Sequence, residues 1–186
     1  MRTLFVIAGV VVAVTGVVLS VVFLTGNPVA VNTGPLGGGP VNGSMCIAGR
    51  QITSIAEDDF RNATSSPILV EKSTLVNAHG VRMLRVDLVP IVAVGGGYDL
   101  LATGGPYPPS REELAAVADA RWGDRRTLPM TMPPGQPGHS WDLVFGLERT
   151  ANAGTADYYQ LQYEWQGSQY IWSSSMAVKM VAGPCP

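Results

Sequence analysis

The chain has 186 residues, and its 12 basic and 14 acidic side chains leave a net charge of −2. This balance argues against binding to nucleic acid and gives no reason to expect attraction to anionic lipid headgroups. Only 14% of the residues are charged, which fits a surface domain with many neighbours.

The stretch Leu4–Leu24 contains no charged residue over 21 positions. A helix of that length is about 30 Å long, which matches the hydrocarbon core of a bilayer. We therefore predict a transmembrane helix over residues 1–25 that contacts membrane lipid. Arg2 precedes it and the next basic residue is Arg50, so the positive-inside rule places the amino terminus in the cytoplasm and the carboxy-terminal part outside the cell.

Two other targeting interpretations fit this segment less well. A cleaved secretory signal has an apolar core of about 7–15 residues, with small residues at the first and third positions before the cut. Here the best site follows Ala30 and has Pro28 at the third position. A lipid anchor needs a cysteine directly after the apolar run, and the first cysteine is Cys46. We therefore expect an uncleaved signal-anchor in a single-pass plasma-membrane protein.

One face of the predicted span carries small residues at helical spacing: Gly9, Ala13, Gly16 and Ser20. Small residues let a second helix approach closely inside a bilayer. The alternative is that these residue types are simply common in spans of this composition. If the small face is used, the protein pairs with itself or with a larger membrane complex.

Residues 26–45 contain six Gly, three Pro and no charge. This composition predicts a flexible linker with a root-mean-square reach of roughly 25 Å. The remaining residues, 46–186, are enough for one domain and too few for two.

The two cysteines, Cys46 and Cys185, lie at opposite ends of that domain. In an oxidising extracellular compartment we expect them to form a disulfide, the alternative being two unrelated thiols. Closing a loop of about 140 residues would stabilise the domain by roughly 5 kcal/mol in the chain-entropy model.

Period-two alternation of apolar and polar residues predicts half-buried antiparallel strands. The predicted strands are 68–76, 81–92, 127–132, 141–149, 158–166 and 170–181. In the second of these we expect Leu84, Val86 and Leu88 to point inward, with Met83, Arg85 and Asp87 outward. Gly167-Ser168 fits a type II′ hairpin turn, which would place Trp165 opposite Tyr170 and Tyr163 opposite Trp172.

A capping box, Ser110-Arg111-Glu112-Glu113, predicts the start of one helix. Apolar residues follow at helical spacing up to Trp122, so this helix should pack against a sheet. Together these elements predict an all-β fold: an immunoglobulin-like antiparallel sandwich with one short inserted helix, preceded by a single amino-terminal transmembrane helix.

The overall layout, with the carboxy-terminal segment WDLVFGLERT…YYQLQYEWQGSQYIW, resembles uncharacterised actinobacterial single-pass surface proteins. The chain has two Lys and ten Arg and is rich in Ala, Gly and Val, and this composition is similar to that of those proteomes. The resemblance covers roughly residues 140–181 and implies a location and a fold class. It implies no activity, because none is assigned to those proteins.

The sequence does not favour an enzyme. His79 and His139 are its only histidines, and it lacks the G-x-S-x-G, H-E-x-x-H and S-x-x-K motifs. The glycine runs lack the Lys and Ser/Thr of a phosphate-binding loop. We therefore predict a protein without catalytic residues or a cofactor.

Two residue sets offer binding chemistry instead. The first set consists of aromatic residues, which either form a stacking surface for envelope glycans or belong to the sandwich core. Its members are Tyr158, Tyr163, Trp165, Tyr170 and Trp172. The second offers thioether and imidazole groups that suit Cu(I), although Met more often fills gaps in a core. Its members are Met130, Met132, His139, Met176 and Met180.

The leading functional hypothesis is a non-catalytic, membrane-anchored surface domain. It would bind a protein partner in the membrane or envelope, or act as an accessory subunit of a membrane complex. Glycan binding is the alternative, and Cu(I) handling is a third hypothesis.

Overall fold

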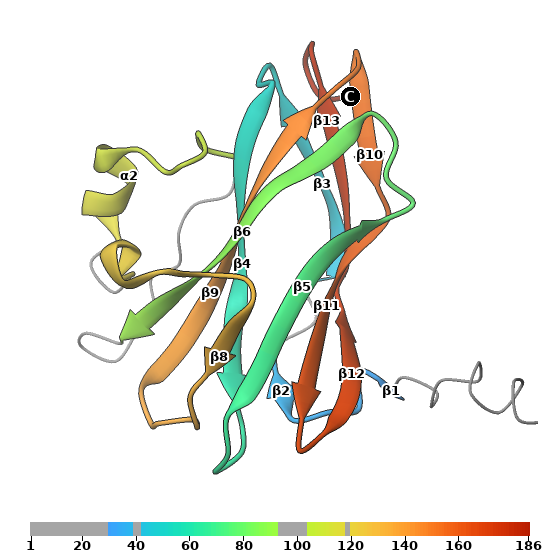
Figure 1. Ribbon diagram of the computed structural model, residues 1–186. Coiled ribbons are helices and arrows are strands. Elements are labelled where there is room, and N and C mark those ends of the chain that lie inside the picture. Colours follow the sequence, from blue (N-terminus) through green and yellow to red (C-terminus); the bar gives the residue numbers. More distant parts are fainter. Residues whose placement is uncertain (1–29, 39–41, 93–103, 118–119) are drawn as a thin grey trace, which may run out of the picture.

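Most of the predicted strands are present in the computed structural model, which describes residues 30–38, 42–92, 104–117 and 120–186 (Figure 1). The strands are β1 (Ala30–Val31), β2 (Leu36–Gly37), β3 (Asn42–Ala48), β4 (Ile52–Asn62), β5 (Ile68–Val76), β6 (Val81–Val92), β7 (Arg126–Thr127), β8 (Met130–Met132), β9 (His139–Arg149), β10 (Ala153–Ala156), β11 (Tyr158–Trp165), β12 (Ser168–Ser173) and β13 (Ser175–Val181). The helices are α2 (Arg111–Ala116) and the short 3₁₀ helix η1 (Trp122–Asp124).

The first sheet has the strand order β2-β4-β9-β6-β7, with antiparallel neighbours. Its central strand, β9, pairs with β4 on one side and with β6 on the other. Phe145 lies opposite both Ile55 and Val86, and all three side chains are buried. This sheet forms one wall of the core.

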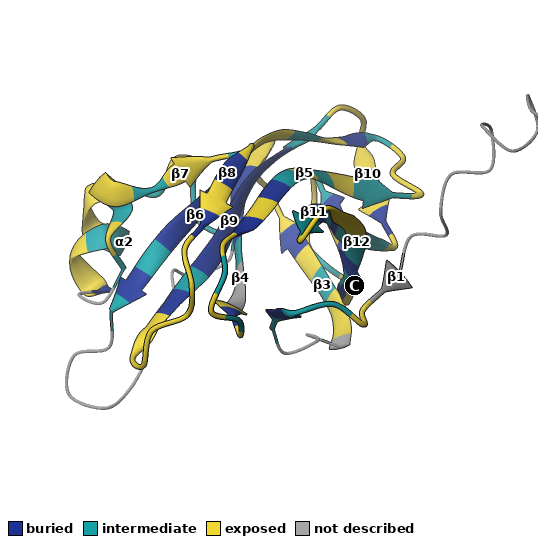
Figure 2. Ribbon diagram, turned by 60° about the horizontal axis from the view of Figure 1, so that its bottom comes forward, coloured by how far each residue is buried: buried dark blue, intermediate teal, exposed yellow. Residues whose placement is uncertain are grey.

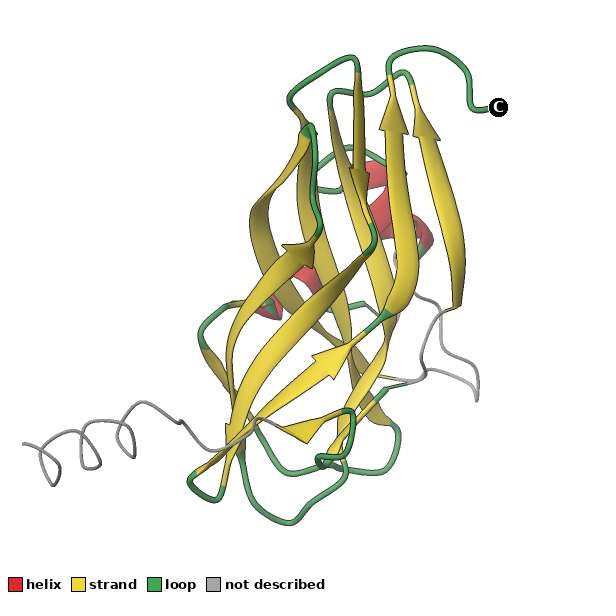
Figure 3. Cartoon of the chain, turned by 90° about the vertical axis from the view of Figure 1, so that its right-hand side faces the viewer, coloured by secondary structure: helices red, strands yellow, loops and turns green. Residues whose placement is uncertain are grey.

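The second wall is built around one long hairpin (Figure 3). Strands β10 and β11 follow each other with only Asp157 between them, and β12 and β13 with only Ser174 between them. They pair antiparallel along their length. The hairpin belongs to two sheets, with the strand orders β1-β12-β11-β5-β8 and β10-β13-β3. Strands β1 and β3 pair in parallel with β12 and β13. The two walls make an all-β sandwich that is mostly antiparallel.

The turn of this hairpin differs from the prediction. Gln166 and Gly167 are its central residues, with φ of 50° and 75°, which is the pattern of a type I′ turn. Tyr163 therefore faces Tyr170, and Trp165 faces Ser168. The shift is two residues, so every aromatic side chain stays on the face that the alternation predicted.

Strand β6 also departs from the predicted alternation. Its register against β9 shifts between Met83 and Arg85, which leaves Leu84 as a bulge residue with 40% of its surface exposed. Met83 consequently packs against the core instead of pointing outward. Beyond the bulge Val86 and Leu88 face the core as expected, but Asp87, on the opposite face, is fully buried.

A third layer explains the burial of Asp87. Residues 104–117 and 120–125, which we call the cap, lie over the outer face of the first sheet, as α2 shows in Figures 1 and 2. The predicted capping box is confirmed, because Ser110 Oγ accepts from the amide of Glu113 and the Glu113 carboxylate accepts from the amide of Ser110. A small apolar cluster of Val89, Val117 and Val144 joins the cap to the sheet. The helix ends at Ala116, and Trp122 lies in η1 instead.

The predicted strand 127–132 is divided between the two sheets. Thr127 in β7 pairs with Asp87 of the first sheet, and Met132 in β8 pairs with Ile68 of the second. The chain therefore crosses from one sheet to the other at Leu128 and Pro129.

The folded part begins earlier than the linker predicted over 26–45 allows. Strand β1 pairs with β12, β2 pairs with β4, and the side chain of Leu36 is 5% exposed. Gly34 approaches so closely that an added Cβ would lie within 3.0 Å of atoms in both Tyr163 and Tyr170. The strand pairings of these short segments override their glycine-rich composition.

The disulfide between Cys46 and Cys185 is confirmed, with Cα atoms 6.0 Å apart. The predicted span over 1–25 and its small-residue face, Gly9, Ala13, Gly16 and Ser20, lie outside the described residues. Among the helices of the described ranges, none has the length and apolar character needed to cross a membrane.

Candidate functional site

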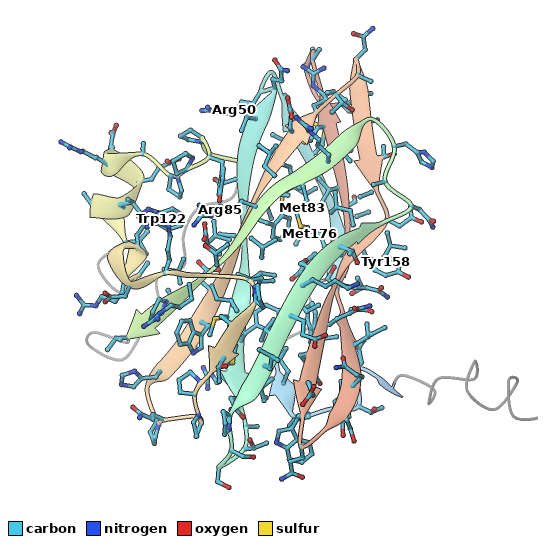
Figure 4. The ribbon with its side chains drawn as sticks, in the orientation of Figure 1. Arg50, Met83, Arg85, Trp122, Tyr158 and Met176 are labelled. Carbon is cyan, nitrogen blue, oxygen red and sulfur yellow. A yellow bond between two sulfur atoms is a disulfide. The ribbon has the colours of Figure 1, made fainter. Side chains whose placement is uncertain are left out.

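The aromatic set divides between core and surface. Tyr163 and Trp172 are 1% and 5% exposed and belong to the core, whereas Tyr158, Trp165 and Tyr170 are half-buried. Trp165 and Tyr170 are neighbours, with ring centroids 6.3 Å apart, and Trp165 Nε1 donates to Ser66 Oγ. Tyr158 lies at the far end of β11 (Figure 4).

The methionine set is spread over different elements. Met130 and Met132 lie on β8, Met176 and Met180 lie on β13, and all four side chains are buried. Met130, Met132 and Met180 pack in the main apolar cluster. His139 is exposed at the start of β9. The methionines therefore act as core residues in this fold.

The most elaborate polar cluster centres on Asp87, beneath the cap. Its Oδ1 accepts hydrogen bonds from Thr127 Oγ1 at 2.8 Å and from Arg85 Nε at 3.1 Å. Its Oδ2 accepts from the Tyr107 hydroxyl at 2.9 Å and lies 3.9 Å from Arg125 Nε. A fully buried carboxylate is costly unless it is paired and hydrogen-bonded, and these four partners meet that need.

Tyr107 fastens the cap to the sheet. Its ring lies against Gly146 of β9, where an added Cβ would come closer than 3.0 Å to three ring atoms. Burial, followed by the hydrogen bond to Asp87 and its negative charge, raises the pKa of the Tyr107 hydroxyl well above its ordinary value. The phenol therefore stays protonated and keeps donating to Asp87.

Arg125 is held in position by the cap. Its Nη1 donates to the backbone carbonyl of Trp122 at 3.1 Å, and its guanidinium carbon lies 4.7 Å from the centre of the Trp122 ring. Its Nε is buried and has no hydrogen-bond acceptor. Arg85 and Trp122 both lie on the cap side of the first sheet (Figure 4).

A pocket of about 600 Å³ opens beside this cluster, where the chain crosses between the sheets. We call it the arginine pocket, and the lining residues that matter here are Arg125, Arg126, Thr127, Thr131, Pro133 and Trp141. None of the described residues that line it is acidic. It is therefore a cationic pocket in a protein of negative net charge.

A second opening, of about 350 Å³, lies between β5 and β6. We call it the edge groove, and the lining residues that matter here are Lys72, Met83, Leu84, Val86, Thr127 and Leu128. Strand β5 pairs with β8 only through 68–70, and β6 pairs with β7 only at 87 and 88. In the part of the chain that the structure describes, both strands therefore present an unpaired sheet edge beside the groove.

Sequence reasoning missed both openings. The alternation in β6 placed Leu84 inside, because a bulge leaves no mark in a hydrophobic pattern. It placed Asp87 correctly on the outer face but did not predict that the cap covers this face. The one available signal of a polar site was the position of Asp87, a charged residue among the apolar residues of a predicted strand. Within the described ranges, no group of three His, Cys, Asp or Glu side chains is placed to hold a metal ion.

The comparisons with known proteins add no relative. The chain matches no family model, and no curated protein matches it.

Proposed function

We propose that this protein is a non-catalytic binding domain held at the cell surface, and that its edge groove receives a strand from a membrane or envelope protein. The amino-terminal apolar segment would anchor it as a single-pass protein with residues 46–186 outside the cell. The observation that carries the proposal is the edge groove, where two unpaired strand edges border an exposed apolar side chain.

An unpaired edge offers a row of amide and carbonyl groups, and an extended peptide can add to it as a further strand. Leu84 supports this role, because the bulge directs a large apolar side chain into water beside that edge. Met83, Val86 and Leu128 line the same groove and would contact alternate side chains of the added strand. The exposed Lys72 would disfavour unselective pairing of edges.

The order of strands supports an immunoglobulin-like assignment. Taking β4, β5, β6, β9, β11 and β12 as B, C, D, E, F and G places B, E and D in one sheet and C, F and G in the other. Strands C and D are then the edges at the groove. Binding through sheet edges and end loops is common on such scaffolds because the sandwich holds them rigidly.

The test is extraction of the full-length protein in a mild detergent, followed by measurement of particle size. We expect a complex larger than one chain, which Leu84→Arg disrupts. Ile52→Arg is the matched control, because Ile52 is 42% exposed and lies outside the groove. A lone monomer in every mild detergent, or equal effects of the two substitutions, would contradict the proposal.

Glycan binding through aromatic residues is the alternative function, and fewer aromatic residues are exposed for it than the sequence predicted. The neighbours Trp165 and Tyr170 are its remaining pair, because Tyr163 and Trp172 are buried. It predicts that Trp165→Ala abolishes binding to envelope polysaccharide. Cu(I) handling has less support, because four thioether groups lie in apolar surroundings and His139 lies apart on the surface.

A further inference from the structure

We propose that the arginine pocket is a second binding site, separate from the edge groove, and that it takes an acidic sugar: a uronate unit of a polysaccharide. The carboxylate would pair with Arg126 and Arg125, and the sugar ring would lie against Trp141 and the pocket's proline walls.

The charge balance of the site calls for an anion. Three guanidinium groups, those of Arg85, Arg125 and Arg126, lie at or beside the pocket. Asp87 is the one carboxylate within 4.0 Å of any of them among the described residues. Among the described residues, two of these three positive charges have no matching carboxylate, and Arg126 is exposed and has no ion pair there.

Arg125 is prepared to bind before a ligand arrives. The Trp122 ring and carbonyl fix the guanidinium, so little side-chain freedom remains to be lost on binding. An arginine held in this way can form paired hydrogen bonds to a carboxylate, which are stronger than hydrogen bonds between neutral groups.

The walls select the rest of the ligand. Trp141 is half-buried, and Pro129 and Pro133 add flat apolar surface. Thr131, which is exposed, also lines the pocket and offers a hydroxyl group, whereas the hydroxyl of Thr127 already donates to Asp87. A pyranose ring has an apolar face that can lie against Trp141 and the prolines, and hydroxyl groups that can bond to the Thr131 side chain. A uronate adds the carboxylate that the arginines would bind. A volume of about 600 Å³ lies within the range of small-ligand sites.

The experiment is a calorimetric titration of the full-length protein in detergent with trigalacturonate. Its methyl ester is the uncharged comparison, and benzoate tests for a general site for aromatic acids. We expect trigalacturonate to bind and the ester to bind at least tenfold more weakly. Raising the salt concentration should weaken binding, because the arginines are partly exposed.

Arg126→Gln should reduce affinity for trigalacturonate at least tenfold, and Arg126→Lys should restore part of it. Arg111→Gln is the control, because Arg111 is exposed on α2 and does not line the pocket. Thr131→Val is a second test, because it removes an exposed hydroxyl group from the pocket and leaves the charge of the pocket unchanged. The proposal is overturned if trigalacturonate does not bind, if Arg126→Gln binds it as well as the unchanged protein does, or if benzoate binds as tightly.

Discussion

Single residues decide how the cap is attached to the sandwich. The Asp87 carboxylate accepts hydrogen bonds from β6, from β7 and from the cap, so three segments far apart in the sequence meet at this side chain. Asp87 lies on the outer face of β6, as the alternation predicts, and the cap that lies over this face buries it. The bulge accounts for the exposed side chain of Leu84 at the edge groove, whereas the cap accounts for the buried polar cluster.

Tyr107→Phe should remove one hydrogen bond to Asp87 while keeping the ring on Gly146. We expect the free energy of unfolding to fall by about 1 kcal/mol, since the phenol is only half-buried. Tyr158→Phe is the control: Tyr158 is also half-buried, and no side-chain hydrogen bond joins it to another described residue.

The same substitution carries a prediction about pH. The folded state raises the pKa of Tyr107, so the hydrogen bond stabilises fully below the unfolded pKa of about 10 and loses its effect as the pH rises beyond that value. The difference between the unchanged protein and Tyr107→Phe should therefore shrink above pH 10 in urea titrations. A difference that grows there would contradict the assignment.

At the scale of elements, the cap is a separate layer that lies on the outer face of the first sheet (Figure 1). Besides the Tyr107 contact, it is joined to the sheet by the Val89, Val117 and Val144 cluster and by hydrogen bonds at both of its ends. Thr53 and Ser54 form hydrogen bonds with the segment 104–105, the amide of Arg121 donates to the carbonyl of Pro90, and Ala120 forms a bridge with Ile91. Such a layer can open locally without unfolding the sandwich.

Gly146→Ala should loosen this layer, because the added methyl group would overlap the Tyr107 ring. We expect a loss of about 1–3 kcal/mol and faster hydrogen exchange over residues 104–117. Gly123→Ala is the comparison, since an added Cβ there would meet nothing within 4 Å. Equal exchange in the two variants would show that the cap does not depend on this contact.

The sequence predicted regular elements well and their irregularities poorly. The bounds of β5 and β6, the capping box and the cysteine pair follow from local patterns. The hairpin turn was placed one residue too late, because Gln166 takes a positive φ that its residue type does not indicate. The bulge at Leu84 and the pairing of Leu36 with Asn62 depend on contacts between distant segments. The edge groove and the arginine pocket were missed for the same reason, since each lies where segments of different sheets meet.

At the scale of the whole molecule, the disulfide joins the two ends of the folded chain. Cys46 lies in β3, which pairs in parallel with β13, and Cys185 lies four residues beyond the end of β13 at Val181. The bond closes a loop across a sequence separation of 139 residues and so keeps the first long strand beside the last.

Replacing both cysteines with alanine should lower the free energy of unfolding by up to about 5 kcal/mol in the chain-entropy model. Urea titrations measure this loss, and reduction of the unchanged protein should reproduce it. If both treatments leave the unfolding midpoint in place, the disulfide does not stabilise the fold.

Photocrosslinking in living cells tests the central claim most directly. A photoreactive amino acid would replace Leu84 in the full-length protein, and Ile52 in a parallel strain, because the two side chains are similarly exposed. We predict that position 84 alone forms an adduct, and that the attached peptide is an extended segment of one membrane or envelope protein. The absence of an adduct at position 84, or the same adducts from both positions, would contradict the account.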